Sequence, residues 1–221
     1  MVMGTGYNPR IVTDGLVLCL DAANARSYPG TGTTLTDRST SGNNAILTNG
    51  PTFSSNNGGR IVFDGTDDEI QLSSSISFSG SPASICVWCT KSGIIAAGSN
   101  YSEGYHIYIA GTSTFQNWGG SHVNFGNPTS LGLLGDDPRY VTIIKDYTNS
   151  VEQLYVNGEL KSSISNSTFK NCTVRGFGRL YYNSGAYAES NMSFYSCQIY
   201  NRALTADEVR QNYLATKERY A

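Results

Sequence analysis

Residues 154–160 read Leu-Tyr-Val-Asn-Gly-Glu-Leu, and this stretch decides the local fold. Asn157 and Gly158 form the dipeptide that favours the two positive φ angles of a type I′ turn, which joins antiparallel strands. A two-residue turn also fixes the register of the strands, so we expect Tyr155 to face Leu160. The stretch therefore predicts a tight β-hairpin.

Similar short apolar segments recur on both sides of this hairpin, and turns rich in Gly, Ser and Asn separate them. Many short strands of this kind are typical of an all-β sandwich or barrel. We find no linker and no internal repeat, so we expect an N-terminal arm over 1–11 and one domain over 12–221. The predicted strands cover 15–20, 44–47, 60–63, 69–72, 84–90, 93–97, 105–110, 140–145, 153–156, 159–164, 173–182 and 192–200.

One helix is indicated, at the end of the sequence. Thr205 and Glu208 have the spacing of a capping box, and Leu204 and Val209 have that of a hydrophobic staple. The pattern predicts a helix over about residues 206–217 that packs on the sandwich. The side chains expected to pack are Val209, Tyr213 and Leu214, and those expected in solvent are Arg210, Lys217 and Glu218.

The charge composition excludes several classes of partner. Only 14% of the residues are charged, against about 25% in an average globular protein. The net charge is −2 at pH 7, so the chain has no general basic field for nucleic acid or for an anionic membrane surface.

No apolar run approaches the ~20 residues of a membrane-spanning helix. The first ten residues also lack the apolar segment of a secretory signal.

The 5 cysteines are an odd number, which argues for free thiols and against a disulfide framework. Cys86 and Cys89 form a C-x-x-C motif, but they lie in a predicted strand. Residues three apart on a strand point to opposite faces, so the pair cannot hold a metal or form a redox couple easily. We therefore predict buried, inert thiols.

Catalytic motifs are absent from the sequence. The paired carboxylates of sandwich-fold glucanases, spaced Glu-x-Asp-x-x-Glu, do not occur. The chain also lacks a Gly-x-Ser-x-Gly elbow and a His-Glu-x-x-His motif, and its 2 histidines are His106 and His122. We therefore expect a protein that is not an enzyme.

Five stretches, taken in order, resemble a known family. They are Gly-Leu-Val-Leu-Cys-Leu-Asp-Ala-Ala-Asn (15–24), Val-Phe-Asp-Gly-Thr-Asp-Asp (62–68), Ala-Ser-Ile-Cys-Val-Trp (83–88), Leu-Tyr-Val-Asn-Gly (154–158) and Ile-Tyr-Asn-Arg-Ala-Leu (199–204). Together they resemble the laminin-G-like, concanavalin-A-like jelly-roll family over about residues 12–213. The resemblance implies an all-β fold, an antiparallel two-sheet jelly-roll sandwich with a short C-terminal α-helix.

The stretch 15–24, Tyr28-Pro29-Gly30 and Asn212-Tyr213 narrow the resemblance to domains in structural proteins of tailed phages of aquatic bacteria. This implies a virion accessory protein, a capsid decoration, head fibre or tail-associated protein, made in the host cytoplasm. Its implied partners are other virion proteins and further copies of itself. The alternative function is a lectin module that binds host surface polysaccharide, with or without Ca²⁺.

A candidate calcium site lies where Asp64, Asp67, Asp68 and Glu69 crowd one turn. Carboxylate oxygens are the ligands that Ca²⁺ prefers, and family members often hold this ion at the rim of the sandwich. We take Asp67 and Asp68 as candidate ligands, with Asp21 as a third if the first strand ends nearby. The alternative is an Asx turn at Asp64 whose neighbours are simply solvated.

A candidate glycan site follows from the sequence Gln-Asn-Trp at 116–118. An aromatic ring packs on the apolar face of a sugar, and neighbouring amides bind its hydroxyls. The same residues also suit a protein interface, and the sequence does not separate the two. Trp88, within a strand pattern, is expected in the core. The candidate glycan- or partner-binding residues are Trp118, Asn117, Gln116, Tyr105, Tyr181 and Tyr182.

Overall fold

The computed structural model describes residues 9–78, 80–90, 94–96, 106–110, 114–118, 122–133, 135–165, 172–182 and 185–220. Every strand pair in this part of the chain is antiparallel. One helix follows the last strand. The predicted all-β jelly-roll sandwich with a C-terminal helix is confirmed.

The larger layer is an 8-stranded sheet in the order β14-β13-β12-β7-β18-β5-β4, with β1 also paired to β18. Its central strands, β7 and β18, are buried along their whole length. The strands are β1 (Leu16–Asp21), β4 (Thr52–Ser54), β5 (Arg60–Val62), β7 (Ala83–Thr90), β12 (Arg139–Asp146), β13 (Val151–Val156), β14 (Glu159–Ser165) and β18 (Ser193–Tyr200).

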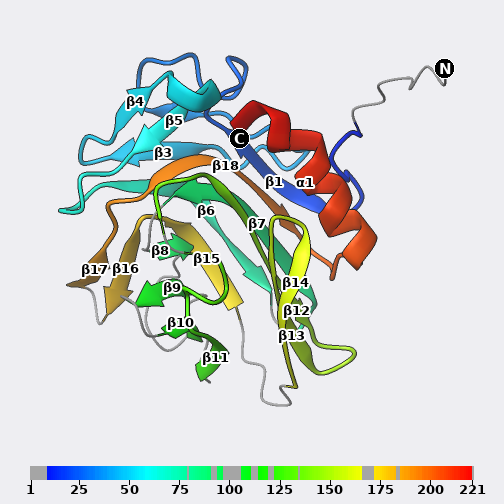
Figure 1. Cartoon of the computed structure of the whole chain (residues 1–221). Coiled ribbons are helices and arrows are strands. Elements are labelled where there is room, and N and C mark those ends of the chain that lie inside the picture. Colours follow the sequence, from blue (N-terminus) through cyan, green and yellow to red (C-terminus); the bar gives the residue numbers. More distant parts are fainter. Residues whose placement is uncertain are drawn as a thin grey trace, which may run out of the picture.

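The second layer is a 4-stranded sheet in the order β15-β6-β3-β2. Two smaller sheets, of four strands (β11-β10-β9-β8) and of two (β16-β17), extend the two-sheet plan. Figure 1 shows these smaller sheets on the side of the molecule away from the helix. The strands are β2 (Thr34–Leu35), β3 (Ala45–Thr48), β6 (Glu69–Phe78), β8 (Ile94–Ala96), β9 (His106–Ala110), β10 (Thr114–Trp118), β11 (His122–Gly126), β15 (Cys172–Phe177), β16 (Arg179–Tyr182) and β17 (Gly185–Glu189).

The large sheet is buried on both faces. Its inner face packs against the second sheet through one apolar cluster that includes Val87, Ile143 and Leu154. Its outer face carries a separate cluster that includes Trp88 and Tyr140. Because strand side chains alternate between faces, β7 contributes to both clusters.

Helix α1 (Ala206–Tyr220) covers the outer face. In Figure 1 it lies beside β1 and β18. The capping box is confirmed, since the Thr205 amide donates to Glu208 Oε2 at 2.9 Å and the Glu208 amide donates to Thr205 Oγ1 at 3.3 Å. Both residues of the expected staple, Leu204 and Val209, are buried in the outer-face cluster. The strong N-cap explains why the helix begins at the predicted residue.

The helix differs from the prediction in its length and in its buried stripe. It runs to Tyr220, three residues beyond the predicted end, because that ring is fully buried and anchors the last turn. The buried residues besides Val209 are Asn212, Thr216 and Tyr220, whereas Tyr213 and Leu214 are only half-buried. Two polar side chains are inside because both hydrogen-bond to groups on the sheet.

The predicted hairpin is confirmed. Asn157 and Gly158 have φ angles of 53° and 79°, and Tyr155 pairs with Leu160. The core position of Trp88 is also confirmed, with 2% of its surface exposed. Cys86 belongs to the outer cluster and Cys89 to the inner one, as their spacing predicts.

Within the described residues, no helix has the length and apolar character needed to cross a membrane.

Candidate functional site

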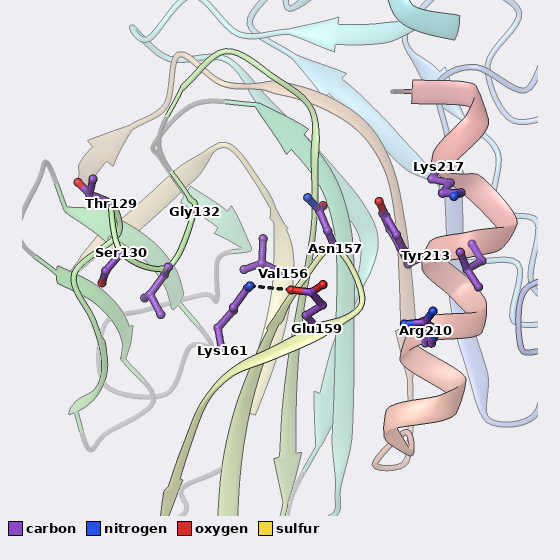
Figure 2. A pocket seen from close by; sticks show the side chains of 12 residues that line it. Thr129, Ser130, Gly132, Val156, Asn157, Glu159, Lys161, Arg210, Tyr213 and Lys217 are labelled. Atoms are coloured by element: carbon purple, nitrogen blue, oxygen red, sulfur yellow. Dashed lines mark hydrogen bonds and ion pairs between the residues drawn. The ribbon is translucent and has the colours of Figure 1, made fainter.

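A groove of about 550 Å³ lies between helix α1, the β13–β14 hairpin and the loop 129–132. We call it the helix–hairpin groove. Figure 2 shows Arg210, Tyr213 and Lys217 on the helix, across from Asn157 and Glu159 of the hairpin. The volume falls within the ~300–1,000 Å³ typical of small-ligand sites. Its lining residues are Thr129, Ser130, Leu131, Gly132, Val156, Asn157, Glu159, Lys161, Arg210, Tyr213, Leu214 and Lys217.

The tip of the hairpin sets one side of the groove. Asn157 Oδ1 accepts a hydrogen bond from the Tyr140 amide at 3.0 Å, which ties the turn to β12. Gly158 lies against the helix, since a Cβ atom at this position would stand 3.2 Å from Tyr213 Cδ1. The positive φ and this close approach together require glycine. The turn residues that form the hairpin therefore also position it against the helix.

The aromatic outer-face cluster sets the other side of the groove. The Tyr213 ring stacks on Trp88, with the ring centroids 5.8 Å apart. Trp88 Nε1 donates to Thr216 Oγ1 at 2.7 Å, one turn further along the helix. Tyr213 is half-buried, so part of its ring faces the groove. A rigid aromatic surface at a groove suits an apolar face of a ligand.

Charged groups line the groove unevenly. Lys161, Arg210 and Lys217 are cationic, and Glu159 is the one carboxylate among the lining residues. Lys161 Nζ donates to Glu159 Oε2 at 2.9 Å, the dashed line in Figure 2. This ion pair and the nearby Arg210 lower the pKa of Glu159. Cationic side chains therefore outnumber carboxylates among the residues that line the groove.

The residues that the sequence predicts for glycan binding lie elsewhere. Gln116, Asn117 and Trp118 are in β10, and Tyr181 and Tyr182 are in β16, of which the structure describes the backbone alone. The two strands belong to different sheets, linked by β8, which pairs with β9 and contacts β16. Tyr105 lies outside the described residues. This candidate site stays a prediction.

The structure brings Asp64, Asp67 and Asp68 together, with one carboxylate oxygen of each within 4.8 Å of the others. The Thr66 amide donates to Asp64 Oδ1 at 2.7 Å, which is the Asx turn considered above. The Asp64 amide donates to Asp68 Oδ2 at 2.9 Å. Burial and the negative charges of Asp64 and Asp67 raise the pKa of Asp68. The spacing and the oxygen donors fit a hard cation such as Ca²⁺.

Asp21 lies apart from these three carboxylates. It accepts a hydrogen bond from the Tyr220 hydroxyl at 2.8 Å and forms an ion pair with Arg219. Among the described residues, Asp21 is not part of the acidic group. The first strand pairs with β18 and ends beside the last turn of the helix, so Asp21 anchors the helix terminus.

The described thiols are unsuited to nucleophilic or redox chemistry. Cys19, Cys86, Cys89 and Cys197 are all free and buried. Burial raises the pKa of Cys86 to about 11 and those of Cys19 and Cys89 to about 12. Such thiols stay protonated at neutral pH.

Comparisons with known proteins show the fold. No family model and no curated protein match the sequence. Among solved structures, the botulinum neurotoxin serotype D ligand-binding domain, in complex with N-acetylneuraminic acid, matches with a TM-score of 0.63 and 16% identity over 91% of this chain and 51% of that one. This chain therefore shares its fold with about half of that ligand-binding domain.

Two further structures agree. The botulinum neurotoxin serotype G binding domain matches with a TM-score of 0.64 and 15% identity, over 90% of this chain and 50% of that one. The binding domain of Paraclostridial Mosquitocidal Protein 1 matches with a TM-score of 0.60 and 17% identity, over 90% of this chain and 52% of that one. The chain thus spans about half the length of these domains. All three of these solved structures are binding domains, and the likeness shows the fold.

Sequence reasoning missed the helix–hairpin groove. Arg210 and Lys217 are expected in solvent, and Tyr213 in the core, when the helix is considered alone. The one usable signal is that positions 210, 213 and 217 share a helix face. Nothing local indicates that this face lies beside the hairpin at 157–161.

Proposed function

We propose that the chain is a non-enzymatic carbohydrate-binding module and that its ligand lies in the helix–hairpin groove. The observation that carries the proposal is the composition of the groove. It combines a half-buried aromatic ring, Tyr213, with the exposed side chains of Asn157 and Thr129 on the opposite side. A sugar needs both an apolar surface and hydrogen-bonding groups for its hydroxyls.

The solved structures support the ligand class. The matching serotype D domain is in complex with N-acetylneuraminic acid, and cell entry of botulinum neurotoxin type C depends on two ganglioside molecules. These ligands belong to domains about twice as long as this chain. They favour a carbohydrate as the class of ligand, and the location rests on the groove.

A glycan array followed by calorimetry tests the proposal. We expect Tyr213→Ala to weaken binding of a hit at least 10-fold, because it removes the stacking surface. Trp118→Ala is the matched variant, because it alters the site predicted from the sequence. Retained binding in Tyr213→Ala with loss in Trp118→Ala would place the ligand in the second site and contradict our assignment.

Calcium binding by Asp67 and Asp68, with Asp64 beside them, is a separate proposal. At a millimolar concentration ten times the Kd, Ca²⁺ would stabilise the fold by about 1.4 kcal/mol. We expect a rise in the melting temperature on adding CaCl₂ and no rise in Asp67→Asn/Asp68→Asn. An equal rise in both proteins would argue against this site.

The role in a phage particle is a second proposal, which rests on the sequence motifs quoted above. It predicts that the protein co-purifies with virions and associates with itself. Detection of the protein in purified particles by mass spectrometry tests it, and absence from particles that otherwise contain all their structural proteins would contradict it.

A further inference from the structure

We infer that the ligand of the helix–hairpin groove is an acidic saccharide whose anionic group pairs with Arg210. The inference rests on the proposed function and narrows its substrate class. It is carried by the charge of the groove, by the unpaired state of Arg210 and by the order of residues along α1.

The charge of the groove is opposite to that of the protein. The whole chain has a net charge of −2. The groove is lined by three cationic side chains, Lys161, Arg210 and Lys217, against the single carboxylate of Glu159. A cationic concave surface on an acidic protein selects an anionic ligand, because the local potential, not the net charge, acts at short range.

Arg210 is the cation best placed to bind this anion. Lys161 is already paired with Glu159 at 2.9 Å, and Lys217 lies 3.6 Å from Glu218. Arg210 is exposed, and within the described part of the chain its guanidinium makes no hydrogen bond or ion pair. A planar guanidinium binds a carboxylate or a sulfate through two parallel hydrogen bonds.

The order of residues along the helix fits a sugar that carries an acid. Arg210 and Tyr213 are three positions apart on the helix. Their Cβ atoms therefore lie about 5–6 Å apart on one face. In Figure 2 both residues lie on the helix, and the Tyr213 side chain points toward the hairpin. A sugar ring packed on Tyr213 would place an acidic substituent beside Arg210, with Lys217 on the other side of the ring.

The opposite side of the groove favours a saccharide over a simple anion. Asn157 Oδ1 is used by the Tyr140 amide, whereas its Nδ2 makes no hydrogen bond within the described residues. Thr129 and Ser130 add exposed hydroxyls. A free phosphate or sulfate ion would contact Arg210 without using these groups.

The test compares acidic oligosaccharides with their neutral counterparts by calorimetry. The probes are a hexuronate trimer and its methyl ester, a sialylated trisaccharide and its asialo form, and a sulfated disaccharide and its unsulfated form. Each is measured with the full chain, with Arg210→Gln and with Arg26→Gln. Arg26 is exposed and outside the groove, so this control makes the same change of charge elsewhere.

We expect at least one acidic probe to bind 10-fold or more tightly than its neutral counterpart. Arg210→Gln should remove most of that difference, Arg26→Gln should not, and 0.5 M NaCl should weaken the acidic probe alone. Equal affinity for acidic and neutral probes, or an acidic preference that survives in Arg210→Gln, would overturn the inference and leave carbohydrate binding intact. Absence of binding to these probes and to a glycan array would overturn both.

Discussion

The two faces of the large sheet are buried by different chemistry. The inner face packs on the second sheet mainly through aliphatic side chains such as Leu18, Ile143 and Ile199. The outer face packs on the helix through aromatic rings, among them Trp88, Tyr140 and Tyr220. The first kind of contact has no preferred direction, whereas the second ends in polar groups that need partners.

Several rings of the outer face make specific hydrogen bonds. Tyr140 donates to Gln198 Oε1 at 2.9 Å, Tyr200 donates to the Val12 carbonyl at 3.0 Å, and Tyr220 donates to Asp21. The first two bonds join the sheet to itself and to the segment before β1. The Tyr220 bond joins the helix to the sheet, as do the bonds from Trp88 to Thr216 and from Asn212 to Tyr200. The comparison shows that the inner face holds the two sheets together. The outer face fixes the position of the helix, on which the helix–hairpin groove depends.

The largest expected effect comes from truncating one ring on each face of the large sheet. Trp88→Ala and Phe194→Ala each remove a ring that is at most 2% exposed. Each should lower the free energy of unfolding by about 3–5 kcal/mol. Only Trp88→Ala removes the surface under Tyr213, so it alone should weaken ligand binding in the groove. Urea denaturation and calorimetry measure the two effects.

Equal loss of ligand binding in both variants, measured where both remain folded, would contradict the different roles of the two faces. It would mean that the groove depends on the stability of the whole sandwich and not on the outer face.

A smaller effect is expected from the buried amide of the helix. Asn212 is fully buried, accepts from the Val12 amide at 2.7 Å and donates to the Tyr200 hydroxyl at 3.0 Å. Asn212→Ala leaves both groups without this partner, so we expect a loss of about 2–3 kcal/mol in urea denaturation. Gln211→Ala, at the exposed neighbouring position, removes one exposed hydrogen bond to the Arg10 carbonyl and should cost less than ~1 kcal/mol. Similar losses would show that the network does not hold the helix.

The helix N-terminus gives a pH-dependent effect. Two hydrogen bonds from Arg202, at 2.6 and 2.8 Å, lower the pKa of Glu208 to about 2 from its ordinary value of 4.5. Stability from this carboxylate is complete above pH 4.5 and is lost as the pH falls toward 2. Glu208→Gln should therefore cost about 1–2 kcal/mol at pH 7.

The difference between wild type and Glu208→Gln should shrink steadily from pH 5 to pH 2 in thermal unfolding. Glu218→Gln, on the exposed side of the same helix, serves as the control. A difference that stays constant over this range would show that the carboxylate charge is not what stabilises the helix start.

Local chemistry made part of this structure predictable. The Asn157-Gly158 turn, the capping box at Thr205 and the opposite faces of Cys86 and Cys89 each depend on residues close together in the sequence. These features are confirmed because a two-residue turn, a helix cap and strand alternation have few alternative geometries. The all-β class followed from many such signals together.

The groove could not be predicted in the same way. Its sides come from the loop at 129, the hairpin at 157 and the helix at 210, and they meet only through tertiary packing. The buried position of Thr216 likewise depends on Trp88, 128 positions away. From the sequence, a polar residue among the apolar positions of a helix is expected in solvent, because its buried hydrogen-bond partner is not evident.

The smallest expected effect compares one thiol from each face of the large sheet. Cys86 and Cys89 lie on the same strand, are both buried and have pKa values raised by burial to about 11 and about 12. Neither should react with iodoacetamide at pH 8 over an hour, as mass spectrometry of the labelled peptides will show. In Asn212→Ala the helix should open locally before the sandwich does, so Cys86 should then react before Cys89. Simultaneous labelling of both thiols would mean that helix and sandwich open as one cooperative unit, and the two faces would differ in chemistry but not in stability.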